Sequence, residues 1–285
     1  MSRRMRTYYY AVIGAIGGLL AWRVSDLLGL SFAPSLFVSE LVVGGLIGLC
    51  IGLLIGAAEG IVSRSPKRAL RSAVVAGPLG LAAGAVGLLL GEAGFQLLGG
   101  EALGRVSGWA VFGTLIGLAE GVAGRTQIWK GALGGLLGGA VGGALVEVAR
   151  RGSADPVLGK AAGLVLLGAS VGAFIALITV LLSRAWLEVV SGKLKGAEFV
   201  LDKFIHAGGP TAIIGSDALK ADIALPDPDI APQHALLSGA GTHVNLKDLS
   251  LSGTYIDNRR IQVAALADRQ RIRLGNTELI YHERR

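Results

Sequence analysis

Charged residues and cysteine are both scarce in this sequence, and each scarcity excludes a class of protein. Asp, Glu, Lys and Arg make up 16% of the 285 residues, whereas a soluble globular chain carries about 25%. Hydrophobic residues make up 52%, and 45 residues are glycine. Cys50 is the single cysteine, which excludes an intramolecular disulfide and a cysteine-based metal cage. The composition predicts an integral membrane region that gives way, near Arg184, to a soluble domain.

Sequence signals for catalysis, metals and nucleic acid are missing or have another explanation. The C-terminal third has no nucleophile elbow, no P-loop and no paired catalytic carboxylates, which predicts that the chain is not an enzyme. His206, His243 and His282 lack metal-ligand spacing, so we expect no metal and no cofactor. The net charge is +7, but many Lys and Arg residues lie between hydrophobic runs. Topology and anionic headgroups explain these charges, so we expect the lipid bilayer rather than nucleic acid as their partner.

Six apolar runs predict six transmembrane helices, because a helix needs about 20 residues to cross a bilayer. The runs are 8–28, 41–62, 73–98, 106–122, 131–148 and 161–182. Lys and Arg are enriched in the N-terminal tail, in the second and fourth gaps and after the last run. The positive-inside rule therefore predicts an inner (cell) membrane protein with both termini in the cytoplasm.

An internal repeat relates these runs. Residues 55–60 (IGAAEG) resemble residues 116–121 (IGLAEG), and residues 84–87 and 139–142 both read GAVG. The pattern predicts three tandem two-helix hairpins in the same orientation. Glycine also recurs every four residues in several runs, which places it on one helix face. This glycine zipper favours tight bundling or self-association as a homo-oligomer, with a glycine-lined pore as the alternative.

Glu59 and Glu120 are carboxylates inside the apolar runs, about one helical turn from the predicted cytoplasmic boundary. Because intramembrane carboxylates are costly and often functional, an ion or proton site is one interpretation. The other interpretation is that they reach the interface or pair with Arg64 and Arg125.

The remainder of the chain divides into a linker and a β-rich domain. Residues 1–184 form the predicted membrane domain, and residues 185–196 form a basic juxtamembrane linker that continues the last helix along the headgroups. Residues 197–285 read as a β-sandwich of short strands. The predicted strands are 199–201, 211–214, 222–225, 235–237, 243–246, 254–256, 271–274 and 278–281.

Several motifs of this domain resemble, in the right order, the forkhead-associated (FHA) family. They are Ile214-Gly215-Ser216, residues 221–228 (ADIALPDP), His234-Ala235, residues 248–256 (DLSLSGTYI) and residues 272–275 (IRLG). The resemblance covers residues 197–285 and implies an eleven-stranded β-sandwich whose loops at one end bind phosphothreonine peptides.

The resemblance also implies roles for single residues. The implied partner-binding residues are Ser216, Lys220, Gln233, Ser250, Ser252, Thr254, Asn258 and Arg259, and the implied structural ones are Gly215, His234 and Gly253. The chain departs from the family where Ser216 replaces the phosphate-holding Arg, Ala231 replaces a phosphate-donor Ser, and Ser252 replaces an Asn that fixes the peptide. Losing a charge-assisted bond to phosphate favours phosphate-independent protein binding. The alternative is a phosphate site with a displaced cation at Lys220, Arg259 or Arg260.

These patterns predict a membrane-anchored adaptor or scaffold that presents an FHA-like module to cytoplasmic proteins, phosphorylated or not, in signalling or assembly. A channel or transporter subunit regulated by the soluble domain is the alternative. A structural oligomer built on the glycine stripes is a third hypothesis.

Overall fold

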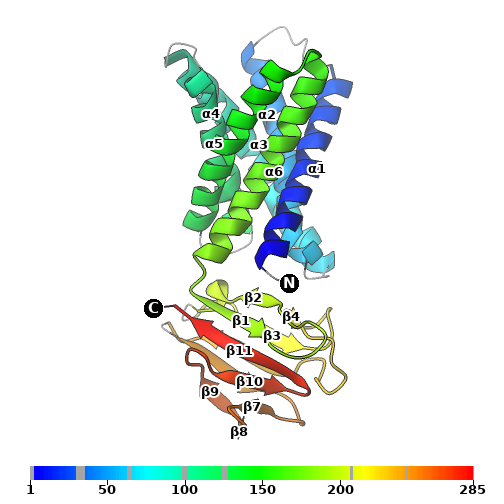
Figure 1. Ribbon diagram of the computed structural model, residues 1–285, viewed down its shortest axis with the longest axis vertical. Helices are drawn as coiled ribbons and strands as arrows, with labels where there is room; N and C mark the ends of the chain where they lie inside the picture. Colours follow the sequence, from blue (N-terminus) through cyan, green and yellow to red (C-terminus); the bar gives the residue numbers. More distant parts are fainter. Residues whose placement is uncertain are drawn as a thin grey trace. The chain divides into compact units, whose positions relative to one another are not determined.

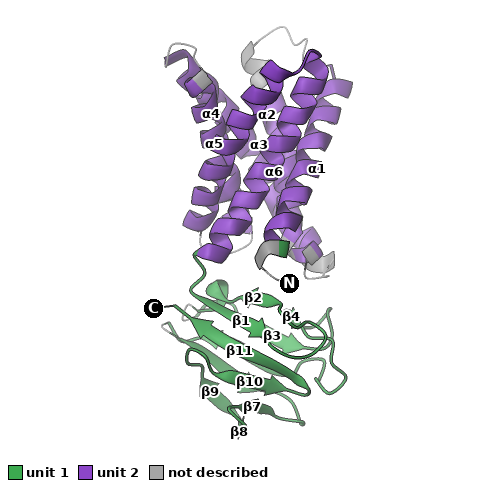
Figure 2. Cartoon of the chain, in the orientation of Figure 1, with its two compact units in different colours: residues 1–5, 63–65, 182–285 green, residues 6–62, 66–181 purple. Residues whose placement is uncertain are grey.

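The computed structural model describes residues 3–29, 36–62, 66–97, 102–123, 128–205, 208–241 and 243–284; within the helices, the side chains at 3–4, 36–40, 59, 62, 66–68 and 102 lie outside the description. The chain forms two compact units (Figure 2). One is a helical unit of residues 6–62 and 66–181, and the other is a β-rich unit formed chiefly by Leu182–Arg285.

Six helices precede the β-rich unit (Figure 1). They are α1 (Arg3–Leu27), α2 (Leu36–Val62), α3 (Pro66–Leu97), α4 (Ala102–Ala123), α5 (Ile128–Gly152) and α6 (Pro156–Leu181). Each contains a segment that is long and apolar enough to cross a membrane. The prediction of six apolar helices is therefore confirmed.

Glycines bring the helix backbones into direct contact. A Cβ atom added at Gly48 of α2 would overlap the carbonyl oxygen of Gly80 of α3, and one added at Gly135 of α5 would overlap that of Gly113 of α4. Gly14 of α1 lies equally close to the backbone of α6. The glycines spaced by four thus face neighbouring helices of the same chain. The relation of the helices as three tandem hairpins stays a prediction.

Large apolar side chains fill the interior of the helical unit. Ile51 and Ile55 of α2, Phe112 and Ile116 of α4 and Leu167 of α6 are all essentially inaccessible to solvent and belong to one cluster. The described side chains of this cluster are apolar apart from the Tyr10 hydroxyl, the Cys50 thiol and the Trp109 and Trp22 ring nitrogens.

Eleven strands of the described chain form two sheets (Figure 1). They are β1 (Ala185–Val189), β2 (Glu198–Val200), β3 (Ala212–Gly215), β4 (Ile223–Ala224), β5 (Ala235–Gly239), β6 (Val244–Asp248), β7 (Thr254–Ile256), β8 (Arg259–Ile261), β9 (Val263–Ala265), β10 (Arg271–Leu274) and β11 (Thr277–Glu283). One sheet has the order β2-β1-β11-β10-β7-β8 and the other the order β4-β3-β5-β6-β9. All pairs are antiparallel except β3 with β4. The expected β-sandwich is confirmed.

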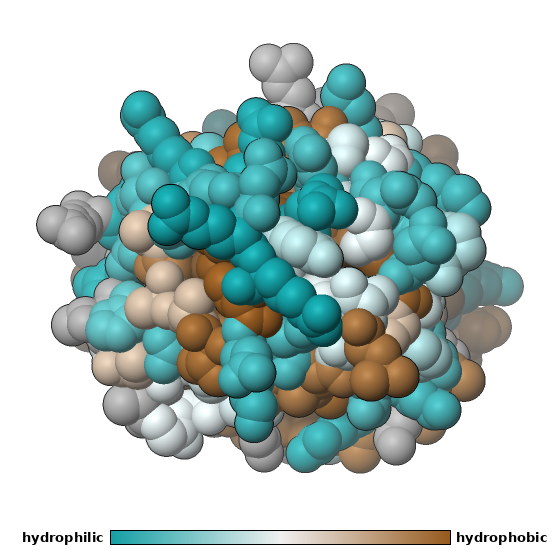
Figure 3. Space-filling model, turned by 90° about the horizontal axis from the view of Figure 1, so that it is seen from below, coloured by the Kyte–Doolittle hydropathy of each residue, from teal (hydrophilic) through white to brown (hydrophobic). Residues whose placement is uncertain are grey.

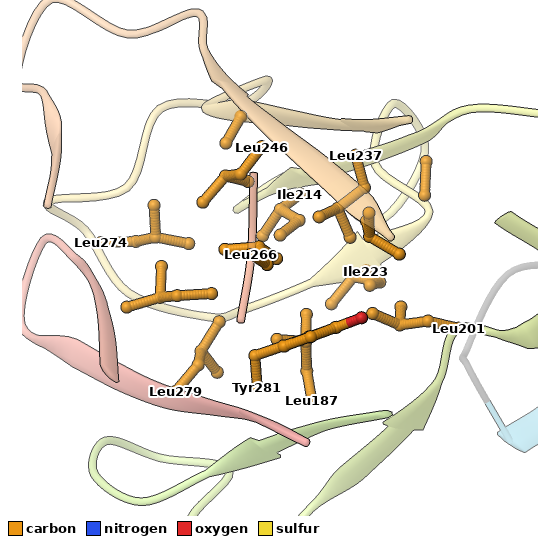
Figure 4. Packing of buried hydrophobic residues seen from close by; sticks show 14 of the residues in the cluster. Leu187, Leu201, Ile214, Ile223, Leu237, Leu246, Leu266, Leu274, Leu279 and Tyr281 are labelled. Atoms are coloured by element: carbon orange, nitrogen blue, oxygen red, sulfur yellow. The ribbon is translucent and has the colours of Figure 1, made fainter. Parts of the chain in front are cut away.

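Side chains from both sheets form the core of the sandwich (Figure 4). Leu187 and Tyr281 come from neighbouring strands of the six-stranded sheet, whereas Ile214 and Leu237 come from the five-stranded sheet. All four are fully buried. Alternate residues of β11 point inward, as expected for a strand with one face on a core.

The predicted linker over residues 185–196 was wrong, because its first half is strand β1. Helix α6 ends at Leu181, and β1 pairs with β11 on one side and with β2 on the other. The Asp202 carboxylate accepts hydrogen bonds from the Arg184 and Ala185 amides at 2.8 and 3.1 Å, which fixes the start of the strand. Leu187 and Val189 point into the core. Strands β8 and β9 were also not predicted.

Candidate functional site

Three loops meet at one end of the sandwich: β3–β4 (residues 216–222), β4–β5 (225–234) and β6–β7 (249–253). The Ser216 amide donates to the Ala231 carbonyl at 3.0 Å, which joins the first loop to the second. A Cβ atom at Gly215 would overlap the Pro232 carbonyl oxygen. The predicted structural role of Gly215 is thus explained by the close approach of two backbones.

The His234 imidazole joins the second loop to the third and is fully buried. Its Nδ1 atom accepts a hydrogen bond from the Ala231 amide at 3.1 Å, so the ring proton lies on Nε2. Nε2 lies 3.3 Å from the Gly253 carbonyl oxygen and 3.1 Å from the Ser250 hydroxyl. Every polar atom of the ring therefore has a partner inside the loops, and His234 is a support rather than a contact residue.

Asp248 organises the β6–β7 loop from the end of β6. Its Oδ1 atom accepts hydrogen bonds from the Ser250 amide, the Ser250 hydroxyl and the Thr254 hydroxyl at 3.1, 2.9 and 2.9 Å. Burial acts to raise the pKa of the Asp248 carboxyl, but these hydrogen bonds outweigh it and the pKa is lowered. The Ser250 oxygen in turn accepts the Gly253 amide at 2.9 Å, where the backbone has a φ of +88°.

Asp227 anchors the β4–β5 loop at its other side. Its carboxylate accepts the Asp229 amide at 3.0 Å, the Asn276 amide at 3.0 Å and the Thr277 hydroxyl at 2.8 Å. The hydrogen bonds hold its pKa below the usual value in spite of the opposing effect of burial. This loop is therefore tied to the β10–β11 turn as well as to its neighbours.

The predicted partner-binding residues fall into three groups. Ser250 and Thr254 are bonded within the loops, and Thr254 is fully buried, so both support the fold. Ser216 is half-buried, while Gln233 and Ser252 are exposed at the loops. Lys220 is exposed on the β3–β4 loop, where its ammonium lies 4.0 Å from the Asp217 carboxylate. Sequence reasoning missed Leu251, whose side chain is 99% exposed at the tip of the β6–β7 loop.

Asn258 and Arg259 lie at the other end of β7 from this loop. Asp257 and Asn258 both have positive φ values of 48° and 68°, which is the geometry of a two-residue hairpin turn. Asn258 lies five positions after Gly253 along the chain, about 16 Å in an extended strand. The structure therefore does not bring Asn258 and Arg259 to the three loops, and Asn258 lines a separate polar cavity of about 280 Å³ with Asp257, Arg271, Arg273 and Glu278.

Arg260 is the cation that reaches the β6–β7 loop. It pairs across the hairpin with Tyr255, and its Nη2 donates to the Leu251 carbonyl at 3.1 Å. Its Nε would lie 2.7 Å from a Cβ atom at Gly253, so its guanidinium lies against the loop. Which of two adjacent arginines turns this way depends on the hairpin register.

The structure describes the two predicted intramembrane carboxylates, Glu59 and Glu120, only in part. The Glu120 side chain is half-buried in α4. The Glu59 side chain lies outside the described part of the chain, and so do Arg64, Arg125 and His206 as whole residues. Over the residues that are described, no three His, Cys, Asp or Glu side chains gather in a way that would hold a metal ion.

Comparison with known proteins finds matches to the β-rich unit. Residues 188–284 match the family model described as "Inner membrane component of T3SS, cytoplasmic domain". The ABC transporter ATP-binding/permease protein Rv1747 of Mycobacterium tuberculosis is 37% identical over 73 residues, which are 25% of this chain. The present chain spans only 8% of the length of that relative.

Solved structures match a similar share of the chain. The crystal structure of the FHA domain of the CT664 protein from Chlamydia trachomatis is 36% identical, over 36% of this chain and 100% of that chain, with a TM-score of 0.33. The FHA-1 domain of Mycobacterium tuberculosis Rv1747 is 29% identical over 36% of this chain and 99% of that one, with a TM-score of 0.29. The cytoplasmic domain of the T3SS sorting platform protein PscD from P. aeruginosa is 24% identical over 35% and 80%, with a TM-score of 0.31. The C-terminal unit of this chain is a forkhead-associated (FHA) domain, and six apolar helices precede it.

Proposed function

We propose that this protein is a membrane-anchored adaptor whose FHA domain binds a cytoplasmic protein through the three loops. The observation that carries the proposal is that some side chains of these loops are hydrogen-bonded within the loops, whereas others are exposed. His234, Asp248 and Ser250 are bonded to one another or to the loop backbone, while Ser252 and Leu251 remain exposed. A pre-organised surface of this kind loses little entropy on binding.

The surface charge of the loops favours a partner that need not be phosphorylated. Ser216, which follows Gly215, can donate a hydrogen bond but carries no charge. Charge-assisted bonds to a phosphate are roughly twice as strong as neutral ones. Arg260 supplies a cation at the β6–β7 loop but already donates to the Leu251 carbonyl. An apolar contact at Leu251 with the Arg260 guanidinium beside it suits a peptide with an apolar residue beside an acidic one.

The setting of the adaptor follows from the helices and the family match. The matched family is described as an inner membrane component, and the distribution of Lys and Arg favours both termini in the cytoplasm. We therefore assign this chain to the inner membrane with its FHA domain in the cytoplasm, where it serves a signalling or secretion-type assembly. The matched domains are interaction modules, and the proposal includes no enzymatic step.

A channel or transporter role, the alternative from the sequence, gains no observation in its favour. The described interior of the helical unit is packed with Ile51, Ile55, Phe112 and similar side chains. A conducting path would need polar groups or water along that axis.

Surface character agrees with a domain that works in water. In the view of Figure 3, hydrophilic residues cover most of the visible face, and hydrophobic residues form smaller patches between them. Among the exposed apolar side chains of the β-rich unit, Leu251 and Leu219 are 99% and 76% accessible. Both belong to the three loops, in β6–β7 and β3–β4.

A peptide library in phosphothreonine and threonine versions tests the proposal on the unit Leu182–Arg285. We expect peptides to bind with less than about threefold preference for the phosphorylated form, and Leu251→Asp to weaken them about tenfold, equivalent to about 1.4 kcal/mol. Ser216→Arg should raise the preference for phosphate. Ala240→Asp, on the exposed β5–β6 turn at the far end of β5, is the control and should change nothing. Strong phosphate selectivity in the wild type would contradict the proposal. Equal loss of peptide binding in Leu251→Asp and Ala240→Asp would also contradict it.

A further inference from the structure

One carboxylate in the helical unit is shared by three arginines. Glu147 of α5 accepts two hydrogen bonds from Arg150, at 2.9 and 3.1 Å, and one from Arg151 at 2.6 Å. Arg105 of α4 reaches the same carboxylate at 3.5 Å. The Glu147 side chain is 10% exposed, whereas those of Arg105, Arg150 and Arg151 are 40%, 57% and 64% exposed. We call these four residues the arginine cluster.

The arginine cluster lies at one end of its helices. Arg150 and Arg151 belong to the last turn of α5, and Arg105 lies in the first turn of α4. Both helices are long and apolar enough to cross a membrane, so their ends are where lipid headgroups lie. The Arg105 guanidinium also lies 4.7 Å from the Phe95 ring centre of α3, which restricts its position.

The cluster carries more positive charge than its own surroundings require. The Glu147 carboxylate contributes one negative charge. The C-terminal end of α5 contributes the equivalent of about half a negative charge, and the N-terminal end of α4 offsets it with about half a positive charge. Three guanidinium groups therefore leave a surplus of about two positive charges. Each guanidinium has five N–H donors, of which Glu147 takes two from Arg150 and one each from Arg105 and Arg151.

We propose that the arginine cluster is a binding site for the phosphate group of an anionic lipid. Guanidinium groups match phosphate oxygens in charge and in planar, two-pronged geometry. Glu147 holds Arg150 and Arg151 in place, so the donors are ordered before the lipid arrives. A zwitterionic headgroup offers the same phosphate but brings a compensating cation, so the surplus charge selects lipids with a net negative charge.

Native mass spectrometry of the full chain in detergent tests this site. The probes are phosphatidylglycerol, phosphatidylcholine and inorganic phosphate. We expect phosphatidylglycerol to be retained about tenfold more than phosphatidylcholine, and inorganic phosphate at millimolar concentration not to displace it. Since each arginine near a membrane surface contributes about fivefold to binding of anionic lipid, Arg150→Gln with Arg151→Gln should abolish the preference. Displacement by inorganic phosphate would identify a free anion as the ligand and overturn the lipid assignment.

Two further variants separate lipid binding from a structural role. Arg23→Gln removes an arginine that is paired one-to-one with Asp26 at 3.4 Å, at the same end of the helices, and should leave lipid retention unchanged. Glu147→Gln keeps an acceptor oxygen that can order the arginines and raises the surplus charge, so it should keep or strengthen the preference, even if it lowers the melting temperature. Equal retention of both lipids by the wild type, or loss of the preference in Glu147→Gln with the melting temperature unchanged, would overturn the proposal.

Discussion

In the helical unit neighbouring helices meet backbone to backbone at glycines, whereas in the FHA domain large side chains fill the space between two sheets. Gly48 and Gly80 leave no room for a Cβ atom between α2 and α3. Leu187 and Tyr281 are fully buried between the sheets. The difference follows from the solvent. Lipid tails are as apolar as leucine, so helices in lipid gain by close van der Waals packing, whereas in water the burial of apolar area stabilises the domain.

The two units also treat buried polar groups differently. In the FHA domain, His234, Asp248 and Thr254 form a connected network in which each group has a partner. In the helical unit, the buried carboxylate of Glu147 lies about one turn before the end of α5 and is bonded to the arginines of the last turn. Such networks order the backbone around them, which is what a binding loop requires.

The largest effect is expected from the core of the FHA domain at β1. Leu187→Ala should lower the free energy of unfolding of Leu182–Arg285 by about 3 kcal/mol, because it removes a fully buried side chain and leaves a cavity. Urea titration measures this free energy. The matched control is Leu219→Ala, at an exposed position, which should change the free energy of unfolding by no more than about 0.5 kcal/mol. Equal stability of both variants would mean that residues 185–189 act as a linker after all.

A somewhat smaller effect is expected where the helices meet. Gly48→Ala adds a Cβ atom against the Gly80 carbonyl oxygen, and the helices must separate at a cost of about 2 kcal/mol. The control is Gly94→Ala, whose Cβ would come no nearer than 4.0 Å to the Ser107 hydroxyl. Thermal unfolding of the full chain in detergent should show a lower melting temperature for the first variant alone. A similar decrease in both would indicate that glycine matters for helix flexibility rather than for contact.

The smallest effect concerns the polar network of the loops. Asp248→Asn keeps an acceptor oxygen but loses its charge, which should cost about 1 kcal/mol at pH 7. Because the pKa of Asp248 in the folded domain lies below the ordinary value of an aspartate, its contribution to stability is present above that ordinary value and is lost as the pH falls through the folded pKa.

Urea titrations at pH 7 and at pH 3 measure this contribution. The wild type should lose more stability on acidification than Asp248→Asn does. Asp227, whose pKa is also lowered, should account for part of the loss that remains in the variant. An identical pH dependence in both proteins would contradict the assigned network.

The sequence predicts the helices and most strands well because their signals are local. An apolar run of sufficient length has few alternatives to a membrane helix, and the motifs around Gly215 and His234 fix a known order of strands. Strand β1 was missed because Leu187, Val189 and Val190 fit an amphipathic helix as well as a strand. Its pairing with β11, almost a hundred residues away, is not visible in the local pattern.

The candidate site was predicted only in part, for a related reason. For His234 and Gly253 the motif predicts a supporting role, which depends on backbone contacts such as the 3.3 Å approach of His234 Nε2 to the Gly253 carbonyl oxygen. Arg259 was chosen over Arg260 because the facing of a hairpin depends on its turn and register. Leu251 has no motif of its own, and its exposure is set by the fold of the whole loop.

Photo-crosslinking in membranes tests whether the three loops are the partner-binding surface. A photoreactive amino acid is introduced into the full chain at Leu251, at the loop tip, or at Ala240, which is exposed at the far end of β5. We predict a discrete protein adduct from position 251, reduced by Arg260→Gln, and none from position 240. Equal adducts from both positions, or none from position 251, would contradict the account.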